Sequence, residues 1–240
     1  MTSPPPPAGP ADMGNADPGN PDTAVVIPVY NEATVIASVV EGVLRHVDKV
    51  VCVDDGSSDG SADEIAKTRA HLVRHPVNLG QGAALQTGLE YALLDPAVRY
   101  FVTYDADGQH RMEDVLTMLD VARQQHVDVV FGSRFLDGRS EVGGVKRAVL
   151  KLAVAYMNAS SGIRLTDAHN GLRVLTRPVV ERLDLRQNGM AHASELVNKV
   201  SRGGYSFAEV PVHILYTDYS KGKGQSLLNS VNILFDLLFR

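Results

Sequence analysis

The segment Tyr100–His110 joins an apolar run to two carboxylates at a spacing that could hold a metal ion. Its first residues, YFVTY, are β-branched or aromatic and predict a buried strand. Asp105 and Asp107 follow, and alternation along an extended chain points their side chains to the same side. Two such carboxylates repel each other unless a cation lies between them, and oxygen ligands suit Mg²⁺ or Mn²⁺. Gln109 could add a neutral oxygen.

A solvated turn with an aspartate at each end explains the same residues, since Asp-x-Asp followed by glycine is common in turns. The choice depends on the elements that would position this segment. Expected strands lie at residues 24–30, 48–55, 71–75, 100–105, 127–135 and 207–214. Expected helices lie at residues 31–46, 56–66, 80–94, 112–125, 145–160, 178–186 and 190–202.

This alternation of strands and helices predicts an α/β fold with a mainly parallel sheet flanked by helices. Ligands bind such sheets beyond the carboxyl ends of the strands. Four polar turns follow expected strand ends, namely Pro28–Asn31, Asp54–Gly56, Asp105–Asp107 and Gly132–Arg134. Because these turns would meet at one edge, they favour a binding site there over an isolated turn.

Length and composition describe one large α/β domain of ordinary soluble character. The chain has 240 residues, of which 44% are hydrophobic and 21% are charged. Its single cysteine excludes an internal disulfide framework, and no apolar stretch is long enough to span a bilayer. Residues 1–22 contain seven of the twelve prolines and no apolar run, which predicts a disordered tail. That tail lacks the features of a secretory signal, so we expect a cytoplasmic protein.

Charge is distributed unevenly along the chain. Residues 1–138 carry 9 Lys and Arg against 20 Asp and Glu, whereas residues 139–240 carry 14 against 8. The basic second part indicates contact with phosphate or an anionic surface, unless the asymmetry is a chance fluctuation.

Residues 216–240 combine a basic loop, which contains Lys221 and Lys223, with an amphipathic segment. One helical stripe of that segment carries Leu227, Val231, Leu234 and Leu238. The stripe could pack on the domain itself or lie on a membrane surface.

Several common site types are not supported by the motifs. The glycines at 80 and 82 follow the third strand, and Leu85 occupies the position of the third small residue of a dinucleotide fingerprint. These glycines instead favour close packing of a helix start near a phosphate. The sequence contains no P-loop, no paired histidine spacing for zinc and no G-x-S-x-G hydrolase motif. A binding module remains open, but the carboxylate pair with basic residues downstream favours phosphate chemistry.

The ordered set VVIPVYNE, VDDGSSDGS, NLGQGAAL, DADGQH, GSRF and TDAHNGLRVL resembles the family 2 nucleotide-sugar glycosyltransferases of the GT-A fold. It is most similar to the dolichyl- or polyprenyl-phosphate sugar synthases. The resemblance covers about residues 24–215, and we assign residues 23–215 to a GT-A-like (Rossmann-like) domain. It implies a nucleotide-sugar donor, a divalent metal (Mg²⁺ or Mn²⁺) and inverting transfer to a lipid phosphate.

The resemblance also implies roles for individual residues. Those expected along the nucleotide are Pro28, Tyr30, Glu32, Asp54, Asp55, Gly80, Gln81 and Asp105. Those expected to hold the metal are Asp105, Asp107 and Gln109. Those expected at the acceptor or donor phosphate are Arg134, Lys146, Arg147 and Arg173. Asp107, Arg134 and Asp167 are the expected catalytic residues, although Lys146 and Arg147 also fit a solvated helix face.

Asp167 occupies the position of the family's candidate base. A hydroxyl acceptor needs a base to remove its proton, but a lipid monophosphate is already largely an anionic nucleophile at pH 7. With a phosphate acceptor, Asp167 would only position Arg173 or the substrate; it also fits an N-cap or a turn.

We therefore expect sugar transfer from a UDP- or GDP-sugar to polyprenyl phosphate, by a protein peripheral to the inner face of the cell membrane. The alternative acceptor is a sugar hydroxyl in a polysaccharide or glycolipid. A catalytically inactive nucleotide-binding regulator is a third interpretation, which the Asp105/Asp107 pair disfavours. We expect no nucleic-acid partner, and the sequence leaves the base, the sugar and the oligomeric state open.

Overall fold

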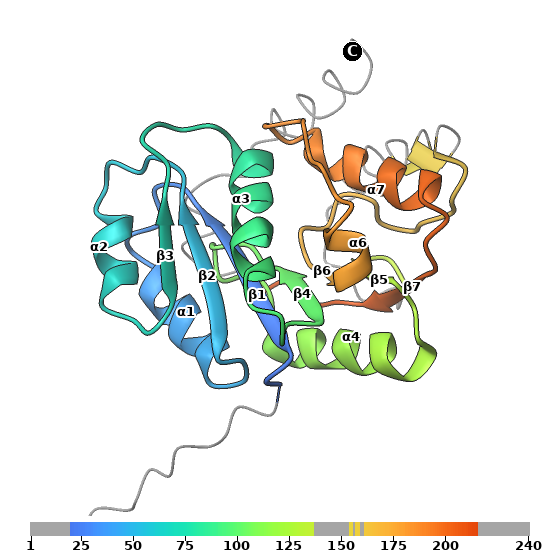
Figure 1. The fold of residues 1–240 in the computed structure, drawn as a ribbon, viewed down its shortest axis with the longest axis horizontal. Helices are drawn as coiled ribbons and strands as arrows, with labels where there is room; N and C mark the ends of the chain where they lie inside the picture. Colours follow the sequence, from blue (N-terminus) through green and yellow to red (C-terminus); the bar gives the residue numbers. More distant parts are fainter. Residues whose placement is uncertain (1–19, 137–153, 156, 159–160, 216–240) are drawn as a thin grey trace, which may run out of the picture.

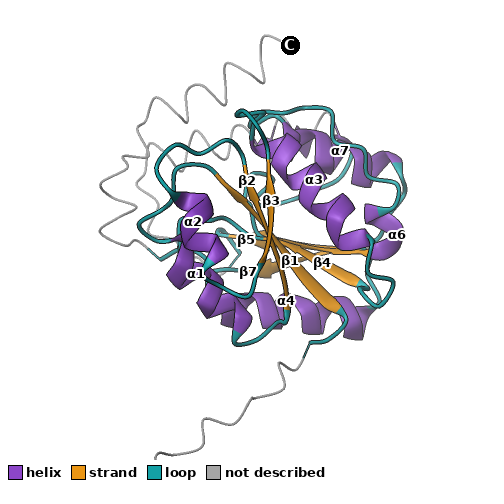
Figure 2. Ribbon diagram, turned by 60° about the vertical axis from the view of Figure 1, so that its left-hand side comes forward, coloured by secondary structure: helices purple, strands orange, loops and turns teal. Residues whose placement is uncertain are grey.

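The computed structural model describes residues 20–136, 154–155, 157–158 and 161–215, and it shows a seven-stranded sheet between two layers of helices (Figures 1 and 2). The strands are β1 (Thr23–Val29), β2 (Lys49–Asp54), β3 (His71–Arg74), β4 (Tyr100–Thr103), β5 (Val129–Ser133), β6 (Arg173–Thr176) and β7 (Phe207–Pro211). The helices are α1 (Ile36–Leu44), α2 (Ser61–Ala66), α3 (Gln81–Leu93), α4 (Met112–Gln125), α6 (Arg177–Val180) and α7 (His192–Arg202).

The strand order is β3-β2-β1-β4-β6-β5-β7. Neighbouring strands are parallel except where one of the two is β6. β6 runs antiparallel to β4 and β5, so the residues that precede it lie at the carboxyl edge of its neighbours. The expected mainly parallel α/β sheet is thus confirmed. The antiparallel β6 is an element that the sequence pattern did not predict.

Each face of the sheet has its own apolar core. One core places Phe101, Phe131 and Leu175 beneath α3, α6 and α7, and the other packs α1, α2 and α4 against the opposite face. The central strands are buried on both faces, which explains their continuous apolar sequences. Figure 2 shows the sheet nearly edge-on between the two helical layers.

Three expected helices differ from the structure by more than three residues at one end, and the one expected at residues 56–66 begins only at Ser61. The first was expected from residue 31 but begins at Ile36, because Asn31 has a positive φ of 56° and the next backbone amides bind the neighbouring loop. Glu32 N donates to Ser61 Oγ at 2.8 Å, and Ala33 N donates to Asp59 Oδ2 at 2.9 Å. The helix expected at residues 178–186 ends at Val180.

Residues 20–22, which we expected to belong to the disordered tail, are held to the domain. Arg123 donates to Asn20 Oδ1 at 2.9 Å and forms an ion pair with Asp22 at 2.8 Å. Lys49 Nζ donates to the carbonyl of Pro21 at 2.8 Å. Residues 20–22 therefore belong to the ordered domain, which we expected to begin at residue 23.

Other expectations lie outside the described residues: the tail before residue 20, Lys146 and Arg147, and the basic loop with its amphipathic segment from residue 216 onward. None of the helices in the described part of the chain is long and apolar enough to cross a membrane.

Candidate active site

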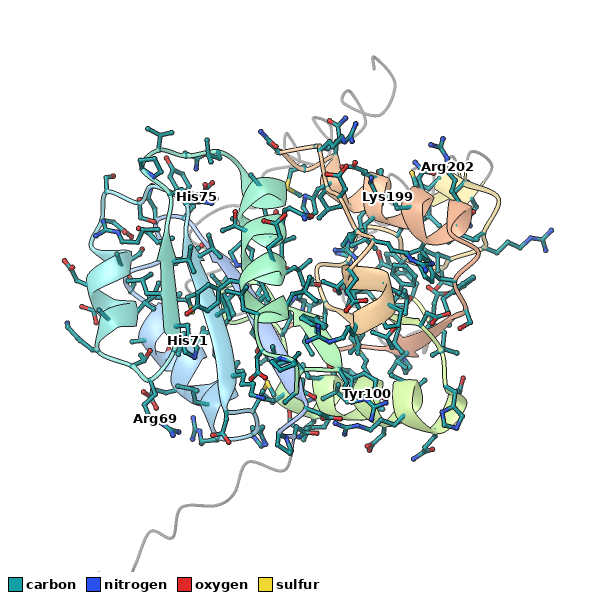
Figure 3. The ribbon with its side chains drawn as sticks, in the orientation of Figure 1. Arg69, His71, His75, Tyr100, Lys199 and Arg202 are labelled. Carbon is teal, nitrogen blue, oxygen red and sulfur yellow. The ribbon has the colours of Figure 1, made fainter. Side chains whose placement is uncertain are left out.

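Polar segments that are distant in sequence meet at the carboxyl edge of the sheet. The four turns expected at strand ends follow β1, β2, β4 and β5, which all run in the same direction. The segment Asp167–Leu172 joins them because it leads into the antiparallel β6. Figure 3 labels His75 at this edge of β3, and His71 and Tyr100 toward the opposite edge of the sheet. The predicted convergence of the turns is therefore confirmed.

Asp105 is fixed by side chains from two elements. Gln81, the first residue of α3, donates through Nε2 to Asp105 Oδ1 at 3.2 Å. His110 Nε2 lies 3.0 Å from Asp105 Oδ2, and its ring packs edge-on against Tyr104. Tyr104 Oη donates to the carbonyl of His110 at 2.7 Å, which holds the histidine in place. This support from outside the turn distinguishes Asp105 from an aspartate that merely closes a solvated turn.

Asp107 is held differently, since its Oδ1 accepts the backbone N–H of Gln109 at 3.0 Å. The carbonyl of Gln109 in turn accepts the N–H of Leu215 at 2.9 Å, which ties the loop to the segment after β7. No three His, Cys, Asp or Glu side chains are arranged as a metal site within the described ranges. Two carboxylates with a nearby amide nevertheless provide the oxygen donors that Mg²⁺ or Mn²⁺ prefers, with positions left for substrate phosphates.

The two aspartates have opposite pKa shifts. Burial alone would raise the pKa of Asp105, but the hydrogen bond and charge of His110 and the charge of Arg173 outweigh it, so this pKa is lowered. Burial and the charge of Asp105 raise the pKa of Asp107, to which Glu32 also contributes. An ionised Asp107 beside Asp105 is therefore unfavourable without a cation, as expected of a metal-binding pair.

These shifts predict a pH-dependent affinity for Mn²⁺. Because the pKa of Asp107 is raised, a proton competes with the cation as the pH falls through that value, and affinity should rise with pH and then level off. The same raised pKa means that ionised Asp107 destabilises the metal-free fold, so Asp107→Asn should increase its melting temperature near pH 7. Mn²⁺ titrations followed by electron paramagnetic resonance, and thermal unfolding without metal, test both. A pH-independent affinity, or a melting temperature lowered by Asp107→Asn, would contradict this.

Gly171 forms the surface against which Asp105 lies. A Cβ at position 171 would overlap the carboxylate of Asp105, so only glycine fits here without displacing it. Thr103 Oγ1 donates to the carbonyl of Gly171 at 2.6 Å, which fastens this backbone to the end of β4. Neither His110 nor Gly171 was among the residues expected at the site, although both lie within the quoted motifs DADGQH and TDAHNGLRVL.

Asp55 organises the start of α3. Its carboxylate accepts the backbone N–H groups of Leu79 at 2.9 Å and Gly80 at 2.8 Å, and it lies 2.7 Å from His75 Nδ1. His75 Nε2 reaches Thr87 Oγ1 on α3 at 3.0 Å. A position next to the nucleotide stays a prediction for Asp55, and the structure adds a role in holding the loop before α3.

Asp54, which precedes Asp55 in the chain, is fully buried. It accepts the N–H of Ser57 at 3.2 Å and lies 3.6 Å from Arg74 Nε. On the adjacent strand, Pro28 lies within β1 and the side chain of Tyr30 beyond it is 50% exposed. The charge of Glu32 acts on Asp107, which places Glu32 near the Asp105/Asp107 pair. Contact of these residues with a nucleoside stays a prediction.

Gly80 and Gly82 permit close packing of the start of α3, as expected. A Cβ on either glycine would overlap the backbone of residues 187–188, and Gly80 also has a positive φ of 103°. Gly82 N donates to the carbonyl of Asn188 at 2.7 Å. The segment before α7 therefore occupies the space that side chains at positions 80 and 82 would fill.

Arg134 and Asp167 form a bidentate ion pair. Arg134 donates from Nε to Asp167 Oδ2 at 2.6 Å and from Nη2 to Oδ1 at 2.9 Å, and its backbone N–H reaches Oδ2 at 3.2 Å. Burial would raise the pKa of Asp167, but the charge and hydrogen bonds of Arg134 lower it below its usual range. Asp167 is thus ionised and paired with Arg134, which makes it a weak proton acceptor. Its side-chain partner is Arg134, and the backbone N–H of His169 also donates to Asp167 Oδ1 at 3.3 Å, whereas we expected Asp167 to position Arg173 or the substrate.

Arg173 was expected at the acceptor phosphate, but its side chain is only 1% exposed. It lies at the first position of β6, opposite Thr103 of β4. In this structure it therefore lies beneath the edge of the sheet, and a direct contact with a lipid phosphate stays a prediction.

Similarity to known proteins identifies the family to which this chain belongs. The model of the glycosyl transferase family 2 matches residues 24–184, and the chain belongs to this family. It is 32% identical over 203 residues to a polyprenol monophosphomannose synthase of Mycolicibacterium smegmatis, covering 79% of this chain and 76% of that protein. It is 27% identical to a UDP-N-acetylglucosamine–dolichyl-phosphate N-acetylglucosaminyltransferase of Methanococcus voltae, covering 89% of this chain and 94% of that protein.

Among solved structures, the chain is similar to glucosyl-3-phosphoglycerate synthase from Mycobacterium tuberculosis in complex with Mn²⁺ and UDP-glucose. The TM-score is 0.69 at 20% sequence identity, and the match covers 91% of this chain and 78% of that one. This likeness shows the GT-A fold.

Proposed function

We propose that this protein transfers a sugar from a UDP- or GDP-sugar to polyprenyl phosphate, with inversion, at the cytoplasmic face of the membrane. The observation that carries the proposal is that one sheet edge brings together the Asp105/Asp107 pair and the Arg134–Asp167 ion pair. The first suits a metal-bound diphosphate and the second suits a phosphate acceptor. The two curated relatives described above, whose names specify lipid-phosphate acceptors, support it.

On the donor side, Asp105, Asp107 and the amide oxygen of Gln109 would hold Mg²⁺ or Mn²⁺. When bound, the ion supplies positive charge that neutralises the leaving nucleoside diphosphate. Pro28, Tyr30 and Glu32 would line the nucleoside. The remaining donor-side residues, which would follow the ribose and phosphates, are Asp54, Asp55, Gly80 and Gln81.

On the acceptor side, Arg134 would keep its ion pair with Asp167 and also donate to an oxygen of the lipid phosphate. Carboxylate and phosphate are both oxyanions that a guanidinium can bind. Asp167 would then orient Arg134 and would not remove a proton, consistent with its lowered pKa. A phosphate nucleophile needs no base at pH 7, so this arrangement favours lipid phosphate over a sugar hydroxyl as acceptor. Lys146 and Arg147 would add positive charge near the same phosphate.

The acceptor class is tested by offering each of several donors to three acceptors. Purified full-length protein with Mn²⁺ would be incubated with UDP- and GDP-sugars and a short polyprenyl phosphate, the matching polyprenol, or a sugar oligomer, and products would be identified by mass spectrometry. We expect sugar on the phosphate alone. Product on the oligomer would move the acceptor to a sugar hydroxyl. Metal-dependent donor binding without hydrolysis or transfer would indicate an inactive regulator.

Residues 225–240 and the loop with Lys221 and Lys223 are expected to dock at the inner membrane surface, because they combine an apolar stripe with basic charge. Vesicles containing anionic lipid should sediment the full chain and should retain much less of a version that ends at Gly224. Vesicles of neutral lipid provide the control. Equal sedimentation of the two chains with anionic vesicles would contradict this expectation.

A further inference from the structure

Arg173 is buried with hydrogen-bonding groups that no described residue satisfies. Its side chain is 1% exposed, and Nε, Nη1 and Nη2 all lack a partner in the described part of the chain. Nδ2 of Asn170, a residue that is 5% exposed, also lacks a hydrogen-bond partner among the described residues. An unsatisfied buried donor costs about 1–3 kcal/mol, and a charged one more, so native structures rarely leave such groups unpaired.

The guanidinium of Arg173 lies near Asp105, the first of the two proposed metal ligands. In the sheet, Arg173 is opposite Thr103 of β4 and Phe131 of β5, on the face that α3 and α7 cover. Asp105 follows Thr103 by two residues, and its carboxylate lies against the backbone of Gly171, two residues before Arg173. The charges of Asp105 and Asp167 both act on Arg173.

Charge balance indicates what kind of group binds the donors of Arg173. Asp167 is already engaged by Arg134, and burial lowers the pKa of His169 and of His192 to about 4, which leaves both histidines neutral. The two carboxylates whose charges act on Arg173 are Asp105 and Asp167, and Arg134 and Arg173 balance them. A bound anion would leave an uncompensated negative charge in a buried region, whereas water accepts hydrogen bonds without adding charge.

We propose that Arg173 is a positioning residue that binds ordered water molecules, and that these connect its guanidinium to the carboxylate of Asp105. Gln81 takes one acceptor site on Oδ1 of Asp105 and His110 one on Oδ2, so each oxygen keeps another site, for water or for a metal ion. Three supports then fix the first metal ligand: Gln81, His110 and the hydrated Arg173. The role rests on the metal site proposed above.

A crystal structure of the metal-free full chain at about 1.6 Å resolution tests the water directly. We expect water molecules within hydrogen-bond distance of Arg173 and Asp105. A direct ion pair between the two residues, a dry cavity, or density for an oxyanion would each overturn the proposal.

Arg173→Lys tests the positioning role, because lysine keeps the charge but loses the planar set of donors. Mn²⁺ affinity, measured by electron paramagnetic resonance, should fall about 10- to 100-fold, as for other groups that orient metal ligands. Arg177→Lys is the matched control: Arg177 donates from Nε to the carbonyl of Val98 at 2.7 Å, at the opposite edge of the sheet. The control should lose thermal stability and keep wild-type Mn²⁺ affinity.

Unchanged Mn²⁺ affinity in Arg173→Lys, or an equal loss in Arg177→Lys, would overturn the positioning role. If the wild-type protein itself binds no Mn²⁺, the proposed metal site fails, and the crystallographic water alone then decides how Arg173 is satisfied.

Discussion

Gly171→Ala is expected to weaken Mn²⁺ binding about 100-fold and to remove most transferase activity, while the protein still folds. The new Cβ would overlap the carboxylate of Asp105, which Gln81 and His110 hold in place. The carboxylate is the movable partner, so it should swing out of position, and the backbone at residue 171, just before β6, should stay in place. The expected damage is therefore to a metal ligand and not to the core.

Gly189→Ala is the matched control, because nothing lies within 4 Å of a Cβ at that position. Its Mn²⁺ affinity and melting temperature should equal those of the wild-type protein. Mn²⁺ titration followed by electron paramagnetic resonance, together with thermal unfolding, distinguishes Gly171→Ala from Gly189→Ala. Wild-type Mn²⁺ affinity in Gly171→Ala would show that Asp105 is not a ligand, or that it binds from another position.

Arg134→Met is expected to destabilise the protein by about 3 kcal/mol, because it leaves the carboxylate of Asp167 buried without its cation. Asp167 is 1% exposed and Arg134 17% exposed at the side chain, so solvent screens this pair little. The double variant Arg134→Met/Asp167→Asn should regain part of the loss. Urea unfolding of both single variants and the double variant gives the coupling energy.

Arg186→Met serves as the control for this ion pair. Arg186 lies 2.7 Å from Asp184, but both side chains are largely exposed, so its loss should have an effect below about 1 kcal/mol. In transfer assays, Arg134→Met should lose activity with polyprenyl phosphate, whereas Asp167→Asn should keep a measurable part. Additive effects in the double variant, or complete loss of phosphate transfer in Asp167→Asn with donor and acceptor still bound, would contradict these roles.

Much of the fold could be predicted because its first half is built from local patterns. Apolar runs that end in polar turns locate β1, β2 and β4, and regular helical spacing locates α3 and α4. The position of Asp105 and Asp107 at a strand end follows from the same pattern. These signals are contained in a few consecutive residues, and the parallel sheet brings the strand ends together without further information.

The remaining features depend on contacts between distant segments. β6 has only four residues, and its antiparallel pairing with β4 and β5 is not encoded locally. Leu183 and Leu185 are both buried, and that alternation indicates an extended segment where we expected a helix. The roles of His110 and Gly171 follow only from their distance to Asp105, which the sequence does not give.

Asp55 illustrates the same limit for the site. The resemblance places this carboxylate at the nucleotide, yet the structure uses it to bind two backbone amides before α3 and the ring of His75. A motif identifies which residues belong together. It does not say which of them contact substrate and which hold others in place.

The most direct test of the central claim is the formation of lipid-linked sugar from a nucleotide-sugar and a short polyprenyl phosphate, with and without Mn²⁺ or Mg²⁺. Asp107→Asn would be compared with Asp120→Asn, which changes an exposed aspartate of α4 outside the site. The account predicts product that requires the metal, is absent with Asp107→Asn and persists with Asp120→Asn. Equal product without metal, or from Asp107→Asn, would contradict it.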